Sequence, residues 1–272
     1  MSQMVLIKIE RIRLSEIIMD ISTIERTILE KCAKDAGWEI DNNSKSDSIN
    51  LFSSFFRETS TIRKSTESSF IIRFSRILNK THFDTCLHSN SSGEFEFSLQ
   101  ESISLSGLLK RIAELFASLP DNPLEQYQKK LAEFSDSEIQ KTEAERIVKE
   151  RVGQDIYRDA IMKYWDGACA VTGCTLKEAL RASHAKPWKN CTSDAERLNV
   201  YNGFLLTANL DALFDKGYIS FTDDGLIMLS SAFAFDGADM RGLGITCDMK
   251  LRWIEDRHLE FLDYHHKNVW KN

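Results

Sequence analysis

A short proline segment near the middle of the chain constrains the fold more than any other sequence feature. Two of the three prolines stand in Leu119-Pro-Asp-Asn-Pro123, directly after a run of helical spacing at residues 105–119. Proline disfavours helix at its own position and at the position before it. Since 272 residues also favour two domains, we expect one domain over residues 1–119 and a second over residues 120–272.

The first domain is predicted to be mixed α/β. Apolar residues recur at helical spacing over residues 15–37, and Gly37 is suited to end that helix. Strand-like runs follow at residues 49–56, 60–64, 70–75 and 94–99, before the helical run at 105–119. Basic and aromatic residues alternate in residues 57–80. A solvated sheet face above an apolar one accounts for that alternation, and a DNA-facing sheet is the alternative.

The second domain begins with helices and ends in shorter elements. Residues 124–134 and 137–165 have helical spacing, with an apolar stripe from Ile147 to Tyr164 in the second run. Asp223-Asp224-Gly225 is a hairpin turn signal between strands at 218–221 and 226–229. His265 and His266 are expected as a surface pair on an amphipathic helix. The predicted class of the whole chain is therefore α+β.

Composition limits the environment and the partners of the chain. The formal net charge is −6, which argues against tight, sequence-independent coating of DNA but leaves local binding open. There is no uncharged apolar stretch of about 18 residues, so no membrane span is expected. The first 16 residues carry charges through their apolar part and do not resemble a secretion signal. Six scattered cysteines suit reduced thiols, and a cytoplasmic protein is expected.

Four ordered motifs lie between residues 169 and 221. They are Cys169-Ala-Val-Thr-Gly173, Arg181-Ala-Ser-His-Ala-Lys-Pro-Trp188, Asn202-Gly-Phe-Leu-Leu206 and Asn209-Leu-Asp-Ala-Leu-Phe-Asp215. Together they resemble the HNH endonuclease family, in the restriction-type branch that carries CAVTG, ASHxKPW, NGxLL and LDALFD motifs. The resemblance covers roughly residues 143–230. It implies a C-terminal ββα-metal nuclease domain, with its core at residues 165–230, that hydrolyses DNA phosphodiester bonds around one divalent cation, Mg²⁺ or Mn²⁺.

The residue types suit this chemistry. His184 follows a strand-compatible run, and a neutral imidazole accepts a proton at physiological pH. Asn202 begins the next apolar run, where its amide can bond the neighbouring loop and fix the ring of His184. Asp211, in a short helix opening near Thr207, is a hard oxygen ligand for Mg²⁺, and Asn209 can add a weaker carbonyl ligand. The predicted catalytic pair is thus His184 and Asn202, and the predicted metal ligands are Asp211 and Asn209.

Some positions depart from the family pattern or keep two interpretations. Many relatives have a carboxylate where this chain has Ser183, and histidine where it has Asp211 or Asn209; Asp215 and a water-mediated Ser183 are reserve ligands. Arg181 and Lys186 flank His184 and are expected to hold the scissile phosphate, with solvated charge as the alternative. A structural zinc is disfavoured, because Cys169 and Cys174 have CxxxxC spacing without a second pair.

The predicted function is a metal-dependent HNH endonuclease with a restriction or defence role. Alternatives are a non-catalytic DNA-binding module that retains the fold and a toxin-like, non-specific nuclease. One base and one cation address one scissile phosphate, so cutting both strands of double-stranded DNA predicts a homodimer. Residues 1–119 show no catalytic set, and we expect them to recognise DNA or to form the dimer.

Overall fold

The computed structural model describes residues 19–54, 58–75, 82, 88–89, 94–135, 143–232 and 236–271. The chain folds into two compact units, the first made of residues 1–78 and 85–109 and the second of residues 79–84 and 110–272. The division falls inside helix α2 (Ser102–Ser118). The proline segment separates α2 from α3 (Asp121–Ser135), as its sequence predicts. The domain boundary at residue 119 itself stays a prediction.

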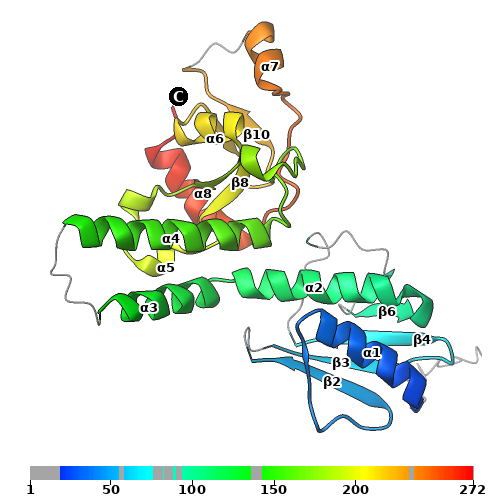
Figure 1. The fold of residues 1–272 in the computed structure, drawn as a ribbon. Coiled ribbons are helices and arrows are strands. Elements are labelled where there is room, and N and C mark those ends of the chain that lie inside the picture. The colour runs from blue at the N-terminus through cyan, green and yellow to red at the C-terminus, as the bar shows by residue number, and fades with distance from the viewer. Residues whose placement is uncertain are drawn as a thin grey trace, which may run out of the picture. The chain divides into compact units, whose positions relative to one another are not determined.

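The first unit is a helix-covered antiparallel sheet with the strand order β1-β2-β3-β4-β6-β5 (Figure 1). Its elements are α1 (Thr23–Asp35), β1 (Glu39–Ile40), β2 (Ser48–Ser53), β3 (Glu58–Lys64), β4 (Ser69–Phe74), β5 (His88–Ser89) and β6 (Phe95–Ser98). Helix α1 begins at Thr23, later than predicted, because Ser22 and Glu25 form a capping box there. Residues 15–18 of the predicted helix lie outside the described residues.

The sheet has one apolar face and one polar face. Phe70, Ile72 and Phe74 of β4 are buried, whereas Arg73 between them is exposed and donates to the Glu94 carboxylate at 2.6 Å. This is the period-2 pattern of a half-buried strand, so here the structure has a solvated face above an apolar one. The predicted basic positions 57, 76 and 80 lie outside the described residues.

The second unit combines helices with two antiparallel hairpins (Figure 1). Its elements are α3, α4 (Glu143–Tyr164), β7 (Leu180–His184), α5 (Asp194–Arg197), β8 (Gly203–Thr207), α6 (Ala208–Asp215), β9 (Ile219–Phe221), β10 (Ile227–Leu229), α7 (Gly237–Leu243) and α8 (Asp256–Asn268). Strands β7 and β8 pair with His184 opposite Gly203. Strands β9 and β10 pair around the predicted turn. The α+β class is confirmed.

The apolar stripe of α4 is buried from Ile156 onward, whereas Ile147 and Val148 are 42% and 43% exposed. One prediction about this unit is wrong. His265 is not a surface residue: it is fully buried, because α8 turns it toward Phe214 and Ser220, whose polar atoms bond both ring nitrogens. Within the described part of the chain, no helix is long and apolar enough to cross a membrane.

Candidate functional site

His184 is the last residue of β7, and its ring is held from three sides. The ring stacks on Tyr157 of α4, with a centroid distance of 3.7 Å and an interplanar angle of 22°. Trp188 meets it edge-on at 5.6 Å. Nε2 lies 2.9 Å from the main-chain carbonyl oxygen of Arg197. Because a carbonyl oxygen only accepts, Nε2 carries the proton and Nδ1 keeps its lone pair.

The protonation state of His184 follows from its surroundings. Burial lowers the pKa of the imidazole from 6.5 to about 4, and the hydrogen bond to the Arg197 carbonyl offsets this in part. The ring is therefore neutral at pH 7. Nδ1 is thus free to accept a proton, and the lowered pKa makes it a weaker base than an exposed histidine.

Asn202 is fully buried and fastens the segment that links β7 to β8. Its Oδ1 accepts from the Lys186 amide at 2.8 Å, and its Nδ2 donates to the carbonyl oxygens of Lys186 (3.2 Å) and Glu196 (3.1 Å). Its own carbonyl oxygen accepts from the Ala185 amide and from the Tyr157 hydroxyl, both at 3.1 Å. The amide thus bonds the neighbouring loop, and that loop carries the Arg197 carbonyl that holds His184.

Two carboxylates on α6 face Ser183 of β7. Asp211 and Asp215 are one helical turn apart, and the Ser183 hydroxyl donates to Asp215 Oδ1 at 3.3 Å and also hydrogen-bonds Asp211. Burial raises the pKa of both carboxyl groups, and the charge of Asp211 raises that of Asp215 further. Arg181 acts in the opposite direction on the pKa of Asp211. The result is a patch of hard oxygen donors whose burial and mutual repulsion are relieved only in part by Ser183 and Arg181.

The β7–β8 hairpin lies between these two groups of side chains. Neighbouring residues of a strand point to opposite faces, so Ser183 faces α6 whereas His184 faces α4. The structure brings Asp211 together with Asp215 and Ser183, and it places His184 with Tyr157 and Trp188. Among the described residues, no group of three or more His, Cys, Asp or Glu side chains is arranged to hold a metal ion.

The segment that contains these groups is similar to a known family. Residues 169–222 match the HNH endonuclease family. This HNH segment runs from the turn before β7 to the end of β9, and it contains His184, Asn202 and both α6 carboxylates. A comparison with curated proteins gave no match.

Asn209 of the HNH segment is placed differently from the other predicted metal ligand. Its Nδ2 donates to the Leu243 carbonyl oxygen at 2.5 Å, at the end of α7. The structure therefore gives this amide a contact that holds α7 to α6. Its role as a ligand stays a prediction, and the partner that the structure provides for Asp211 is Asp215.

The two predicted phosphate-binding residues differ in their surroundings. Arg181 is exposed, and its Nη1 donates to the carbonyl oxygens of Glu178 (2.8 Å) and Leu180 (2.9 Å). Lys186 donates to both carboxylate oxygens of Glu196 at 2.9 Å, and this ion pair raises the pKa of the lysine. Arg181 is thus the cation placed beside the carboxylate patch, and Lys186 is already paired within its own loop.

Cys169 and Cys174 close a turn at the start of the HNH segment. The Cys169 amide donates to the Cys174 carbonyl oxygen at 2.8 Å, and Gly173 has a φ of +70°, a conformation that favours glycine. The buried Cys169 sulfur accepts from the amide of Thr172 at 3.4 Å. The backbone of a tight turn thereby accounts for the glycine in this motif.

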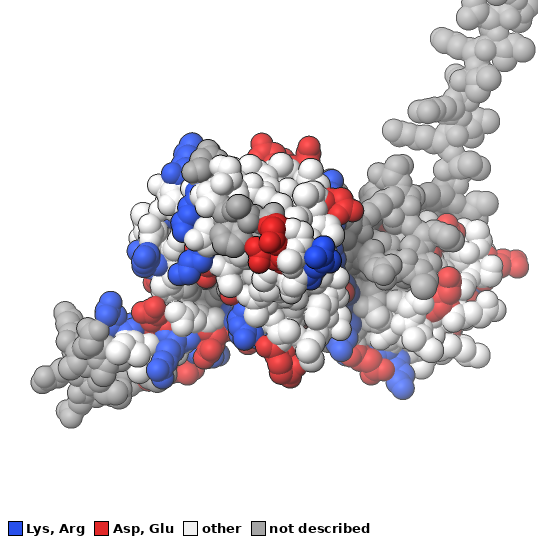
Figure 2. Space-filling view, turned by 90° about the horizontal axis from the view of Figure 1, so that it is seen from above, with Lys and Arg blue, Asp and Glu red and all other residues white. Residues whose placement is uncertain are grey.

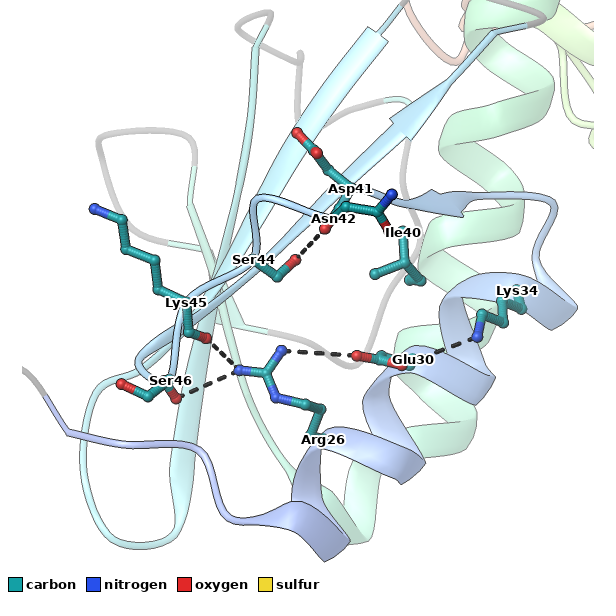
Figure 3. A pocket seen from close by; sticks show the side chains of 9 residues that line it. All are labelled: Arg26, Glu30, Lys34, Ile40, Asp41, Asn42, Ser44, Lys45 and Ser46. Carbon is teal, nitrogen blue, oxygen red and sulfur yellow. Dashed lines mark hydrogen bonds and ion pairs between the residues drawn. The ribbon is translucent and has the colours of Figure 1, made fainter.

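The first unit contains a broad, open hollow of about 640 Å³ between α1 and the segment before β2 (Figure 3). Its charged groups bond one another: the Arg26 guanidinium lies 3.6 Å from Glu30 and donates to the carbonyl oxygens of Lys45 and Ser46. Lys34 also lies 3.9 Å from Glu30. These contacts join α1 to the sheet, and we assign the hollow no binding role.

Sequence reasoning missed the two aromatic partners of His184. Trp188 stands inside a motif that the sequence singled out, but the motif assigned it no role at the site. Tyr157 lies on α4, outside the HNH segment, in a stripe that predicts burial without saying what is buried against it. The sequence feature that could have indicated close packing near Tyr157 is Gly153, a glycine in the interior of a helix.

Proposed function

We propose that the chain is a metal-dependent endonuclease that hydrolyses phosphodiester bonds of double-stranded DNA, with a restriction or defence role. The observation that carries the proposal is His184 at the end of β7 of an HNH segment, neutral and tied through Nε2 to the Arg197 carbonyl. This arrangement leaves Nδ1 to accept a proton from the attacking water.

The donor set on α6 fits a divalent cation. Asp211 and Asp215 are two carboxylates whose pKa values are raised by burial and by their mutual repulsion, and a bound cation would relieve both effects. Oxygen ligands of this kind suit Mg²⁺ and Mn²⁺. Such a cation supplies charge stabilisation at the phosphate. In this proposal Asp211 is the ligand and Asn209 a weaker one, as the sequence predicts, and Asp215 joins them.

In this proposal several residues near the C-terminal end of β7 have separate roles. Ser183 and His184 are the last two residues of β7, so the carboxylate patch and the imidazole lie on opposite faces of the same end of the hairpin. Asn202 keeps the β7–β8 loop in place and with it the acceptor of His184 Nε2. Arg181, beside the patch, is the residue we propose for the phosphate, with Lys186 as a second cation.

Recognition of DNA and assembly are part of the same proposal. One site cuts one strand, so a double-strand break needs two copies, most simply in a twofold dimer. On the face that Figure 2 shows, Lys and Arg side chains are scattered among Asp and Glu. In this proposal the electric field at the site, and not the charge of the face that Figure 2 shows, attracts the DNA.

The test is plasmid nicking with Mg²⁺ or Mn²⁺ by the full chain and by His184→Ala. The matched control is His266→Ala, because Nε2 of His266 also meets a main-chain carbonyl, that of Phe221, at 3.0 Å. We expect His184→Ala to lose about 100-fold or more of the nicking rate, and the control to keep it. Equal nicking by wild type and His184→Ala, or no nicking in either metal, contradicts the proposal.

The second candidate function is a DNA-binding module that keeps the HNH fold without hydrolysis. The observation that favours it is the hairpin between His184 and the α6 carboxylates. This function predicts retention of DNA in a gel-shift assay, with no metal-dependent nicking. The nicking experiment above therefore separates the two candidates.

A further inference from the structure

Helix α4 lies outside the HNH segment, yet it makes the closest ring contact to His184. Tyr157 is 2% exposed, and its ring lies almost parallel to the imidazole at 3.7 Å. The stack covers one side of the imidazole and limits its rotation. Rotation of this ring would change the direction of the Nδ1 lone pair, the group to which the proposed function assigns the proton transfer.

The Tyr157 hydroxyl adds a second tie to the same machinery. It donates to the Asn202 carbonyl oxygen at 3.1 Å, and Asn202 fastens the loop that carries the acceptor of His184 Nε2. The neighbouring Arg158 donates to the Leu180 carbonyl oxygen at 3.0 Å, at the other end of β7. Tyr157 and Arg158 of α4 are thereby held near the two ends of β7.

Two glycines make room for these aromatic contacts. A Cβ atom at Gly203, opposite His184 in the hairpin, would collide with the Tyr157 hydroxyl and with the Ser183 carbonyl oxygen. A Cβ atom at Gly153 of α4 would lie 2.6 Å from the ring of Trp188, the second aromatic partner of His184. Glycine in a helix interior lowers helix stability by about 1 kcal/mol relative to alanine, so close packing accounts for Gly153.

We propose that Tyr157 is a positioning residue for His184, which it holds through the ring stack and through the Asn202 carbonyl. This inference rests on the proposed nuclease function and extends it to a helix outside the HNH segment. The ring stack is the part that orients the imidazole, and the hydroxyl holds the loop.

The experiment uses the full chain with Tyr157→Phe, which keeps the ring, and Tyr157→Met, which keeps an apolar side chain of adaptable shape without a ring. The controls are Tyr164→Phe and Tyr164→Met. Tyr164 is fully buried in the same helix, but its hydroxyl donates to Glu255 at 2.8 Å, away from His184. The ¹⁵N chemical shifts of His184, recorded at constant neutral pH, report its tautomer. The rate of single-turnover nicking and the affinity for DNA are measured for the same variants.

We expect Tyr157→Phe to keep the Nε2-protonated tautomer and a nicking rate within a few-fold of wild type. Tyr157→Met is expected to show mixed tautomers and about a 100-fold lower nicking rate, the size of effect that a misplaced catalytic group produces, with DNA affinity unchanged. Both Tyr164 variants should leave the His184 signals as they are.

Wild-type His184 signals in Tyr157→Met, or the same change in Tyr164→Met, overturn the proposal. So do mixed tautomers in Tyr157→Phe, because this variant keeps the ring and loses only the hydroxyl; its result keeps the proposal falsifiable where the Met variant does not fold. If wild type nicks no DNA but the Tyr157→Met signals change as expected, the proposed nuclease function fails and the positioning of His184 stands.

Discussion

Acid should destabilise the second unit through a buried histidine of α8. His265 is fully buried on α8, with Nε2 at 3.0 Å from the Phe214 carbonyl oxygen and Nδ1 at 3.1 Å from the Ser220 hydroxyl. Its ring stacks on that of Phe214 at 4.0 Å. Burial lowers its pKa from 6.5 to about 4, and the buried His258 shows the same lowering. Both side chains are therefore neutral in the folded protein at pH 5.

The sign of the effect follows from the lowered pKa. Above pH 6.5 each imidazole is neutral in the folded and the unfolded chain, so these histidines add no pH dependence. Below pH 6.5 the unfolded chain binds a proton that the folded chain takes up only near pH 4, and the free energy of unfolding falls across this interval. For one such group the loss is about 2 kcal/mol at pH 5, and for His258 and His265 together about 4 kcal/mol.

Urea unfolding followed by tryptophan fluorescence measures this loss, because four of the five tryptophans belong to the second unit. His265→Gln is the informative variant, since its amide can still donate to the Phe214 carbonyl oxygen but does not titrate. We expect the difference in unfolding free energy between pH 7.5 and pH 5.0 to be about 2 kcal/mol smaller in His265→Gln than in wild type. The raised pKa values of Asp211 and Asp215 cancel in this comparison. An equal difference in both proteins refutes the reasoning.

Further expectations concern the loop, the carboxylates and the assembly. Asn202→Ala should lower the free energy of unfolding by about 3 kcal/mol, because it leaves the Lys186 and Glu196 backbone groups without buried partners; unchanged urea unfolding would count against the loop-fastening role. Asp211→Ala should weaken Mn²⁺ binding in calorimetric titration while circular dichroism stays unchanged, and an unaltered affinity would move the ligand role to Asn209 or Asp215. Sedimentation of the full chain should give a dimeric mass when it is bound to duplex DNA, and a monomeric complex that cuts both strands would contradict the dimer.

Much of the fold follows from local sequence patterns. Strands β2, β3, β4 and β6 of the first unit, the break between α2 and α3, and the β9–β10 hairpin are confirmed where they are described, because period, proline and turn signals act within a few residues. The two-residue strands β1 and β5 were not predicted. The prediction that His265 lies at the surface is wrong because its partners are distant in the sequence. Its acceptor and its hydroxyl partner come from α6 and β9, and no local pattern shows that a buried histidine will find both.

The candidate site, too, was predicted only in part from the sequence. The motifs placed His184, Asn202 and Asp211 in one hairpin-and-helix segment, which the HNH match covers. They did not show on which side of the hairpin each side chain lies. Strand alternation decides that point: Ser183 and His184 are neighbours, so only one of them faces the α6 carboxylates. The partners on the other side, Tyr157 above all, are distant in sequence and are found only through packing.

These contacts indicate that the geometry of the HNH segment is held from outside it. On one side α4 supplies Tyr157 to the His184 ring and to the Asn202 carbonyl. On the other side α8 supplies His265, whose ring bonds the carbonyl of Phe214, the residue before Asp215. Each flanking helix therefore fixes one half of the proposed site: α4 the proton acceptor, and α8 the helix that carries the carboxylates. A segment limited to residues 169–222 would keep every motif and lose both supports, so the geometry of the proposed site depends on the second unit as a whole.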